Sequence, residues 1–456
     1  MELKMKDLKV ERISLPESIE EIFERLSRVD YSFFLDSSMN DGNRGRYSFI
    51  GAEPFLVFRS KGSRIELIGR DGKTKRGNGN PFDFLKSLMK RYRIKNSLNV
   101  PFAGGAVGYF AYDLGEFSIR DFKLKAADDL KNWDCILGFY DCVLMRDNLE
   151  EDTFFVSADE NSREEFFGLI AGKTGESQKY WKLKTSIESD FTKQEYCKAV
   201  EKVKDYIAAG DIYQANLSQR FSAGFEGDPW SLYKRLRRIN PAPFAAYLNF
   251  PEVKVLCDSP ERFLKKEGRL VETRPMKGTR PRGRTQTEDR RMKTDLENSI
   301  KDKAENLMIV DLERNDLGKV CEYGSVKVSE LEVVETYPTV FQMVSSVKGK
   351  LRKNVDAVDC LKACFPGGSI TGAPKVRAME IIDELEPTRR NIYTGAVGYL
   401  GFDGDMDLNI AIRTIIVKDK KVYFQVGGGI VADSKPDEEY RETLVKAKAL
   451  MNALRR

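Results

Sequence analysis

The fold is decided by the stretch Val253-Lys-Val-Leu-Cys-Asp-Ser-Pro-Glu-Arg-Phe-Leu-Lys-Lys-Glu-Gly-Arg-Leu270, which is followed by Thr273-Arg-Pro-Met-Lys-Gly-Thr279. The first part has the pattern of two strands joined by a turn. In that layout Glu261 and Lys277 lie at neighbouring strand ends. A carboxylate and an amine that share one pocket can act as general acid/base and as nucleophile. This pair is therefore the first candidate for a catalytic site.

A lysine attacks only as the free amine, so the pKa of Lys277 must be lowered in such a site. Arg274, Arg280 and Arg282 are close in sequence and would lower it by like-charge repulsion if they shared the pocket. An ordinary solvated loop lysine fits the same spacing. This stretch alone leaves both interpretations open.

The composition is that of a large globular chain. Its 456 residues are 41% hydrophobic and 11% aromatic, enough for a large core in two domains or one complex domain. No apolar run is long enough to span a bilayer, and the N-terminus lacks an apolar signal core. The cysteines are odd in number, scattered, and form no CxxC pair. We therefore expect a cytoplasmic protein without membrane attachment.

Charge gives little reason to expect a polyanionic partner. The net charge is +5, from 76 basic and 71 acidic residues mixed along the chain. The densest basic stretch, Arg280–Arg284 with Arg290 and Arg291, fits either attraction of a small anionic substrate or a solvated loop. Long basic runs with interleaved aromatic residues are missing, so we expect no nucleic-acid binding.

The chain contains no histidine. This excludes the usual neutral-pH base, any Ser-His or Cys-His nucleophile, and any histidine-bound metal. Any chemistry must use carboxylates, lysine, tyrosine or backbone groups, with an oxygen-bound cation as a further option.

The organisation changes near residue 174. Residues 1–173 have the pattern of alternating strands and turns with a few helices, whereas 174–190 is polar and lysine-rich, as linkers are. A new unit follows, in which Thr192 and Glu195 form a capping box ahead of helically spaced apolar residues. We therefore expect an N-terminal region 1–173, a linker 174–190 and a C-terminal region 191–456.

Two predicted helices each carry a pair of acids. Asp302 and Glu305 lie three residues apart in the helical stretch 296–317, and Glu439 and Glu442 have the same spacing in a helix that starts near Pro436. Two such pairs could clamp a hard cation through oxygen ligands alone, as Mg²⁺ prefers. They could equally be surface carboxylates.

Three further features point to ligand binding without proving it. The strand after Gly210 turns Gln214 to one face with other polar residues, so this face is solvated or lines a site. Three glycines at 427–429 follow an apolar strand and allow either close backbone approach to a ligand or a bulge. Arg413 lies on an otherwise apolar strand and needs an anion, either a substrate carboxylate or an internal partner.

Several stretches, taken in chain order, closely resemble the chorismate-utilising enzymes: Gly210–Ser218, Ser259–Phe263, Thr273–Thr279, Lys301–Asp316, Pro366–Lys375 and Gly427–Ser434. The match runs from about residue 191 to the C-terminus. The stretches Gly45–Gly51 and Gly104–Tyr109 resemble the N-terminal region of anthranilate and aminodeoxychorismate synthase large subunits.

The resemblance implies an α+β fold with large antiparallel β-sheets packed face to face and helices outside. It implies chorismate as substrate and Mg²⁺ as cofactor, with Glu305 and Glu442 as ligands and Asp302 and Glu439 in support. Glu261 would be the general acid/base at the departing ring hydroxyl. The residues implied to hold chorismate or lie beside it are Tyr399, Arg413, Gly427, Gly428, Thr371 and Lys446.

Two positions separate the members of this family. Isochorismate- and salicylate-forming members have a water-activating lysine where Gln214 stands, and glutamine cannot deprotonate water, so the resemblance implies ammonia as the nucleophile. Anthranilate synthases carry alanine where Lys277 stands, whereas aminodeoxychorismate synthases of this type carry lysine. The implied reaction is C4 amination through a covalent adduct of Lys277. Its product, 4-amino-4-deoxychorismate, leads to 4-aminobenzoate and folate.

Two other readings remain open. One is an anthranilate synthase large subunit, and the other is a non-catalytic chorismate- or amino-acid-binding regulator. The family usually has a histidine where Gln342 stands, and glutamine cannot shuttle a proton at neutral pH.

Partners follow from the absent histidine, because such a chain cannot contain a Cys-His-Glu glutamine amidotransferase. We expect a heterodimer with a separate small amidotransferase subunit. The segment Phe34-Leu35-Asp36-Ser37 lies where some relatives bind tryptophan, which predicts a tryptophan site in the N-terminal region.

Overall fold

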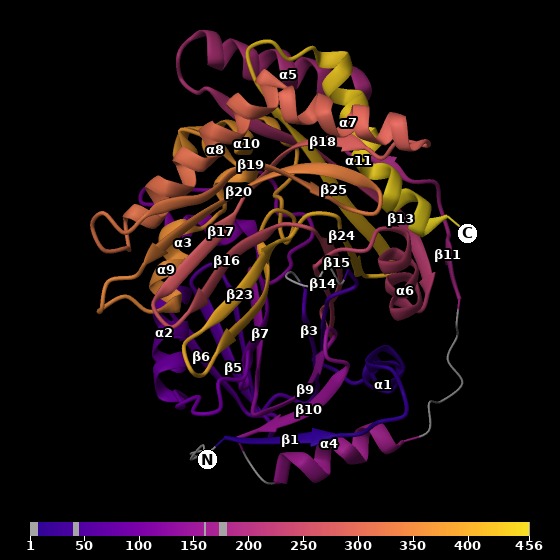
Figure 1. Ribbon diagram of the computed structural model, residues 1–456, viewed down its shortest axis with the longest axis vertical. Coiled ribbons are helices and arrows are strands. Elements are labelled where there is room, and N and C mark those ends of the chain that lie inside the picture. Colours follow the sequence, from indigo (N-terminus) through magenta and orange to yellow (C-terminus); the bar gives the residue numbers. More distant parts are fainter. Residues whose placement is uncertain (1–7, 40–44, 159–160, 173–179, 456) are drawn as a thin grey trace.

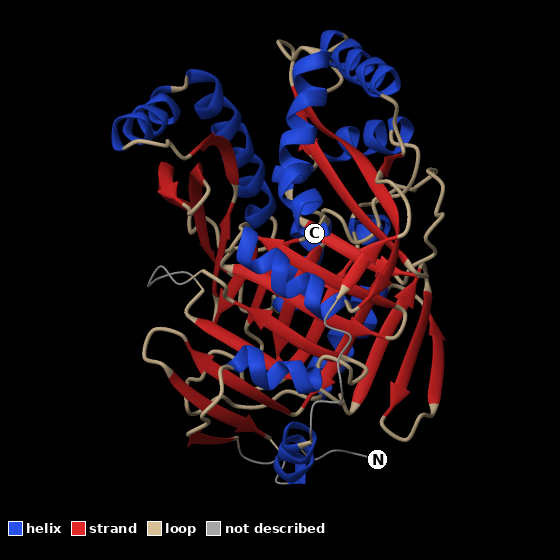
Figure 2. Cartoon of the chain, turned by 90° about the vertical axis from the view of Figure 1, so that its right-hand side faces the viewer, coloured by secondary structure: helices blue, strands red, loops and turns tan. Residues whose placement is uncertain are grey.

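The computed structural model describes residues 8–39, 45–158, 161–172 and 180–455. Two large sheets form the centre, and helices cover their outer faces (Figures 1 and 2). Neighbouring strands run antiparallel, as β14 does with β15 and β22 with β7. The predicted α+β fold of face-to-face antiparallel sheets with outer helices is confirmed.

The first sheet has 13 strands. Its path is β1 (Lys9–Ile13), β10 (Asp152–Ser157), β9 (Cys142–Asp147), β3 (Tyr47–Gly51), β2 (Ser32–Asp36), β14 (Phe244–Phe250), β15 (Val253–Ser259), β24 (Thr414–Lys418), β25 (Lys421–Ile430), β13 (Gln214–Gly227) and β11 (Trp181–Leu183), with β12 (Glu188–Ser189) and β21 (Gly372–Ala373) also on β13.

The second sheet has 12 strands. Its path is β18 (Met276–Pro281), β20 (Val340–Lys350), β17 (Leu270–Arg274), β16 (Arg262–Glu267), β23 (Met406–Ile410), β22 (Ala396–Gly401), β7 (Gly105–Phe110), β8 (Cys135–Tyr140), β4 (Leu56–Lys61), β5 (Arg64–Gly69) and β6 (Thr74–Asn78), with β19 (Lys327–Thr336) also on β20.

The helices are α1 (Ile19–Leu26), α2 (Pro81–Arg91), α3 (Gly115–Ser118), α4 (Asn161–Ala171), α5 (Lys193–Ala208), α6 (Pro229–Ile239), α7 (Gln286–Asn298), α8 (Ile300–Gly318), α9 (Ala357–Cys364), α10 (Lys375–Leu385) and α11 (Pro436–Leu454), with short 3₁₀ turns η1 (Tyr112–Leu114) and η2 (Gly368–Ile370). The predicted capping box of Thr192 and Glu195 begins α5.

The core consists of layers because each sheet is covered on both faces. One apolar cluster joins the facing sheets, with Val107 and Ile136 from one and Leu248 and Val255 from the other. Further clusters pack the outer faces against helices, such as α1, α6 and α11 on the first sheet. Strands covered on both sides lose the polar alternation of exposed sheets, so β8 is buried at every position.

The two predicted regions meet inside both sheets. N-terminal β2 pairs with C-terminal β14, and β7 pairs with β22. Of the predicted linker, residues 174–179 lie outside the described residues, while β11 and β12 are short strands on β13. The N- and C-terminal regions therefore share their sheets.

The stretch Val253–Leu270 differs from its predicted form. Strand β15 belongs to the first sheet and β16 to the second, so the chain crosses between sheets at Pro260 and Glu261 and makes no hairpin there. The predicted helix over 296–317 is also two helices. Ser299 separates α7 from α8, because its side chain caps α8 by accepting from the N–H of Asp302.

Candidate active site

Glu261 lies where the chain crosses from one sheet to the other. Its side chain is 4% exposed. One carboxylate oxygen accepts a hydrogen bond from Ser369 Oγ at 2.5 Å, and the backbone N–H of Met276 also donates to the carboxylate. Burial raises the pKa of Glu261 to about 7, although the bond from Ser369 and the charges of Lys277 and Arg413 oppose the rise. A carboxyl group of this kind can donate or accept a proton near neutral pH.

Lys277 lies beside Glu261 at the start of β18. Burial lowers its pKa, and the charge of Lys446 lowers it further, while Glu305, Glu261 and Glu442 oppose the change. The structure therefore brings together the predicted amine, the predicted acid and the acids of two helices. A partly buried lysine with a lowered pKa has more of the free amine that nucleophilic attack requires.

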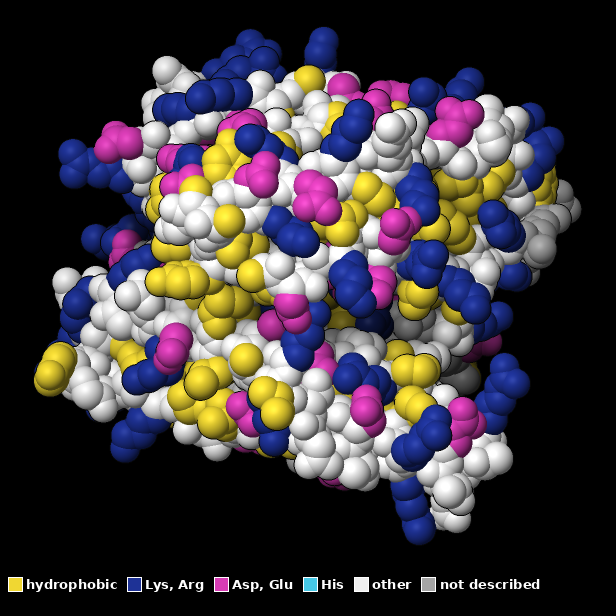
Figure 3. All heavy atoms as spheres, turned by 90° about the horizontal axis from the view of Figure 1, so that it is seen from above, with side chains coloured by type: hydrophobic (Ala, Val, Ile, Leu, Met, Phe, Trp, Pro, Cys, Tyr) yellow, Lys and Arg dark blue, Asp and Glu magenta, His cyan; other side chains and the backbone are white. Residues whose placement is uncertain are grey.

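The three arginines that were expected to lower this pKa lie elsewhere. Arg274 binds Glu330 and Glu335, Arg280 binds Asp295 and Asp302, and Arg282 binds Asp289. Carboxylates neutralise their charges, so that expectation was wrong. Figure 3, which views the face carrying α5 and α7, shows basic and acidic side chains interspersed.

The glycines 427–429 lie in the last part of β25, which extends through them to Ile430, whereas the sequence predicted them to follow the strand. They pair with β13 opposite Asn216, Leu217 and Ser218. A Cβ atom at Gly429 would lie 1.8 Å from Gln214 Nε2 and 3.4 Å from Lys277 Nζ. The missing side chain therefore lets Gln214 and Lys277 approach the same point of the strand. Gln214 is buried, and its Oε1 has no hydrogen-bond partner within the described part of the chain.

The acids of α8 and α11 face the same place. A Cβ at Gly428 would lie 3.4 Å from Glu439 Oε2 and 3.6 Å from Glu442 Oε1. Lys446 bridges Glu442 at 2.7 Å and the carbonyl of Gly427 at 3.0 Å. The Lys446 charge lowers the pKa of Glu442, whereas burial raises the pKa of Glu305 and of Glu439.

The donor set suits a hard cation, because every candidate ligand is a carboxylate oxygen. Asp302 is engaged by Arg280, and Glu439 by Ser434. Glu442 is paired with Lys446, so Glu305 is the one of these four acids that makes no hydrogen bond or ion pair in the part of the chain that the structure describes. Among the described residues, no three acidic or thiol side chains already converge as a preformed metal site. The side chains therefore fit Mg²⁺ by chemistry, and their closing on the ion would have to accompany its binding.

Arg413 and Thr371 border the same region. Arg413 lies between β23 and β24 with a φ of 50°, not on a strand as predicted. Its Nη1 donates to Asn240 Oδ1 at 3.3 Å, and no carboxylate of the described residues forms an ion pair with it. Thr371 is buried beside Ser369, and its hydroxyl donates to the carbonyls of Gly367 and Gly368.

Tyr399 is not brought to this site. Its hydroxyl donates to the carbonyl of Pro101 at 3.2 Å, and its ring lines a separate cavity of about 570 Å³. Tyr399 lies on β22 in the second sheet, where Val107 of β7 is its neighbour. Its sequence neighbourhood resembles a substrate-binding segment, but the strand directs the side chain elsewhere.

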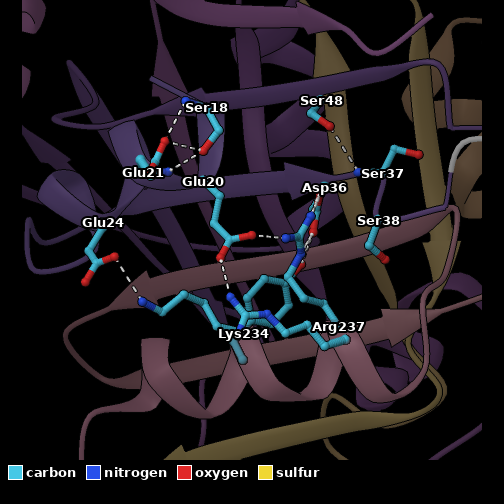
Figure 4. Close-up of polar contacts among 12 residues, drawn as sticks. Ser18, Glu20, Glu21, Glu24, Asp36, Ser37, Ser38, Ser48, Lys234 and Arg237 are labelled. Carbon is cyan, nitrogen blue, oxygen red and sulfur yellow. Dashed lines mark hydrogen bonds and ion pairs between the residues drawn. The ribbon is translucent and has the colours of Figure 1, made fainter. Parts of the chain in front are cut away.

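The cavity that Tyr399 lines includes part of the predicted tryptophan segment. Leu35 and Asp36 line it, together with Phe49, Arg46, Arg262 and Asp407. The carboxylate of Asp36 is bound by the guanidinium of Arg237 at 2.6 Å and by the Tyr233 hydroxyl at 3.1 Å (Figure 4). Asp36 is therefore already paired within the protein.

Sequence reasoning missed Ser369, the hydroxyl that contacts Glu261 directly. It lies in the glycine-rich stretch Pro366–Lys375, one of the stretches that resemble the chorismate-utilising enzymes. No spacing rule links residues 261 and 369. The stretch itself was the only available signal.

Comparisons with known proteins agree over nearly the whole chain. Residues 33–452 match the family model described as chorismate binding enzyme. The chain is 41% identical over 425 residues to aminodeoxychorismate synthase component 1 of Bacillus subtilis, covering 90% of this chain and 89% of that one. It is also 41% identical over 441 residues to anthranilate synthase component 1 of Aquifex aeolicus, covering 93% and 89%.

Among solved structures, anthranilate synthase component I from Streptococcus pneumoniae superposes with a TM-score of 0.78 and 31% identity, covering 90% of this chain and 93% of that chain. The relatives that match at equal identity carry two different names. Overall similarity therefore does not choose between the two reactions. Within the described residues, no helix is long and apolar enough to cross a membrane.

Proposed function

Because the chain belongs to the family of chorismate-binding enzymes, we propose that it aminates chorismate at C4 to give 4-amino-4-deoxychorismate without releasing pyruvate. The observation that carries this proposal is Lys277, a partly buried amine of lowered pKa beside Glu261 and Gln214. An anthranilate synthase needs no nucleophilic amine at this position.

The residues divide the chemistry between them. The Lys277 amine forms a bond to ring carbon C2, both ring double bonds shift, and the C4–O bond breaks as Glu261 donates the proton that turns the hydroxyl into water. The added nitrogen loses a proton. Ammonia then attacks C4, both double bonds shift back and the C2–N bond breaks. The new nitrogen at C4 loses a proton, the lysine nitrogen takes one up, and the lysine leaves as the neutral amine.

The substrate's acid groups need positive partners. Arg413, which lacks an ion-pair partner among the described residues, would hold one carboxylate, with Lys446 and the backbone at Gly427 and Gly428 nearby. Glu305 and Glu442 would hold Mg²⁺, with Asp302 and Glu439 in support. When bound there, the ion would neutralise and fix a carboxylate of chorismate.

Ammonia would come from a glutamine amidotransferase small subunit in a heterodimer. The histidine-free chain has no residues for a Cys-His amidotransferase of its own, and its relatives are named as component 1. Free ammonium at high concentration would then replace the partner. A cytoplasmic location goes with this role. The cavity beside Leu35 is the proposed place for tryptophan, since it combines apolar and charged walls.

The function is tested by incubating the purified protein with chorismate, Mg²⁺ and ammonium. We expect no fluorescent anthranilate, and 4-aminobenzoate only after an aminodeoxychorismate lyase is added. Direct formation of anthranilate would establish the second candidate, which the Aquifex relative favours. A protein that binds chorismate and forms neither product would be a regulator.

The turnover of chorismate should depend on the protonation of Glu261. Its acid form, which protonates the departing hydroxyl, predominates below its pKa of about 7 and is lost above it. With the concentration of unprotonated ammonia held constant, turnover should therefore fall as pH rises through about 7. The charged groups around Glu261 are Lys277 from β18, Arg413 from the β23–β24 loop and Glu313 from α8.

Glu261→Gln should lower turnover by about 10²–10⁴-fold. It should also remove the fall in turnover with rising pH, which we call the Glu261 limb of the pH profile. Glu267→Gln, at the exposed end of β16, the strand that begins directly after Glu261, is the matched control and should leave both unchanged. An unaltered pH limb in Glu261→Gln would remove the assignment of Glu261 as the acid.

A further inference from the structure

Arg390 and Glu386 form a buried ion pair next to α10, and the proposed reaction does not use it. Arg390 is 3% exposed and Glu386, at the end of α10, is 4% exposed. Arg390 donates to Glu386 through Nε at 2.9 Å and through Nη2 at 2.7 Å. The guanidinium stacks on the rings of Tyr112 and Tyr393, at 4.9 and 5.8 Å from their centroids.

The remaining donors of Arg390 hold two segments of the site. Nη1 donates to the carbonyl of Ile370 at 2.9 Å, and Nη2 donates to the carbonyl of Asn216. Ile370 lies between Ser369 and Thr371, and Asn216 lies two residues after Gln214 on β13. The two segments are also joined directly, because the N–H of Asn216 donates to the carbonyl of Thr371 at 2.8 Å.

Glu386 completes the connection from the other side. Its Oε1 accepts from the N–H of Ser218 at 2.9 Å and from the Ser218 hydroxyl at 2.6 Å. Together, Arg390 and Glu386 therefore fix β13 and the η2 turn to each other through bonds to the backbone. We call these two residues the Arg390 clamp.

Stability alone is a weak reason for such a pair. Desolvation of two charges can cost as much as their attraction returns, and well-packed apolar residues often replace a buried pair without loss. A planar guanidinium that bridges three acceptors does fix their relative positions, which apolar groups cannot do. One of these acceptors is the carbonyl of Ile370, the residue directly after Ser369, which donates to Glu261.

We propose that Arg390, held by Glu386, is a positioning residue that sets the hydrogen bond between Ser369 and Glu261. The inference rests on the proposed function only for its activity readout. The hydrogen bond from Ser369 favours the ionised form of Glu261, as do the charges of Lys277 and Arg413. The negative charge of Glu313 opposes this ionisation. Loosening the clamp therefore weakens that bond and moves the titration of Glu261 to higher pH.

The test compares Arg390→Lys, Ser369→Ala and the double variant. A lysine keeps the charge but cannot bridge the same acceptors in one plane. We expect each single variant to raise the pH at which turnover falls through ionisation of Glu261. For Ser369→Ala the expected rise is about one pH unit. In the Ser369→Ala background, Arg390→Lys should add no further shift, because the bond through which it acts is already absent.

Arg59→Lys is the matched control. Arg59 also makes two hydrogen bonds to a buried acid, both to one carboxylate oxygen of Glu66, at 2.9 and 2.6 Å, and its guanidinium lies 4.3 Å from the centroid of Trp133. It lies on β4, far along the second sheet from β18. We expect it to lower the melting temperature and leave the pH limb in place. The proposal is overturned if Arg390→Lys lowers turnover equally at every pH. It is also overturned if Arg390→Lys shifts the pH profile as much in the Ser369→Ala background as in the unaltered protein.

Two measurements keep the test decisive. If Arg390→Lys does not fold, Glu386→Gln keeps the shape of the clamp and is expected to give the same upward shift in smaller size. The titration of Glu261 can also be followed without turnover, from its carboxyl band in infrared difference spectra against Glu261→Gln. An unmoved band in the clamp variants overturns this inference, whereas absent turnover with a moved band counts only against the proposed function.

Discussion

Lys277→Ala is expected to abolish C4 amination, with turnover reduced by at least about 10³-fold, since alanine removes the proposed nucleophile and no other lysine replaces it in the same geometry. The reason lies in the position of the amine. Lys277 Nζ approaches the gap at Gly429 next to Gln214, within the field of Glu261, Glu305 and Glu442. The measurement is formation of 4-aminobenzoate from chorismate and ammonium in the presence of excess lyase.

Lys277→Arg distinguishes a nucleophile from a mere positive charge. Arginine keeps the charge but is not deprotonated in proteins, so it cannot attack the ring. We expect it to be as inactive as alanine. Lys435→Ala, which removes an exposed lysine paired with Glu438, is the control and should retain full turnover. Substantial activity in either Lys277 variant would contradict the covalent route.

The alanine variant also tests the choice between the two reactions. If Lys277 directs nitrogen to C4, its removal leaves only direct attack of ammonia on the ring. Fluorescent anthranilate from Lys277→Ala would then indicate that the same pocket supports the alternative amination once the amine is gone. Unchanged production of aminodeoxychorismate would place the nucleophile elsewhere.

Local patterns predicted the elements of this fold well. The capping box at Thr192 and the start of α11 at Pro436 depend on residues within one helical turn, where sequence spacing and physical distance are nearly the same. The acid pairs on α8 and α11 were found for the same reason. Such features need no knowledge of which strands pair.

Features that depend on long-range pairing could not be read in this way. Strands β15 and β16 are adjacent in sequence, yet they belong to different sheets, and this crossing is what buries Glu261. The arginines near Lys277 are close to it in sequence, but each is paired with carboxylates, and the pKa of Lys277 is lowered by burial and by Lys446 instead. Arg413 was expected on a strand because its neighbours are apolar, whereas the backbone there turns with a positive φ.

Removal of either proposed Mg²⁺ ligand, Glu305 or Glu442, is expected to have the second large effect on turnover. Glu305→Ala or Glu442→Ala is expected to raise the Mg²⁺ concentration needed for half-maximal turnover by about 10²-fold or more, because each removes one of two direct oxygen ligands. Asp302→Ala and Glu439→Ala should have smaller effects, because these two acids are proposed to support the direct ligands, with Arg280 and Ser434 holding them in place. The measurement is a Mg²⁺ titration of turnover at saturating chorismate and ammonium.

Two matched controls separate metal binding from the general loss of a helical acid. Asp311→Ala on α8 and Glu438→Ala on α11 remove exposed carboxylates whose partners are Arg314 and Lys435. Both should titrate with Mg²⁺ as the unaltered protein does, because exposed pairs of this kind contribute little. Excess Mg²⁺ should restore turnover in Glu442→Ala if the loss lies in affinity. A Glu305→Ala protein with an unaltered titration would mean that α8 supplies no ligand, and the acids of the two helices would then serve only to balance Lys277 and Lys446.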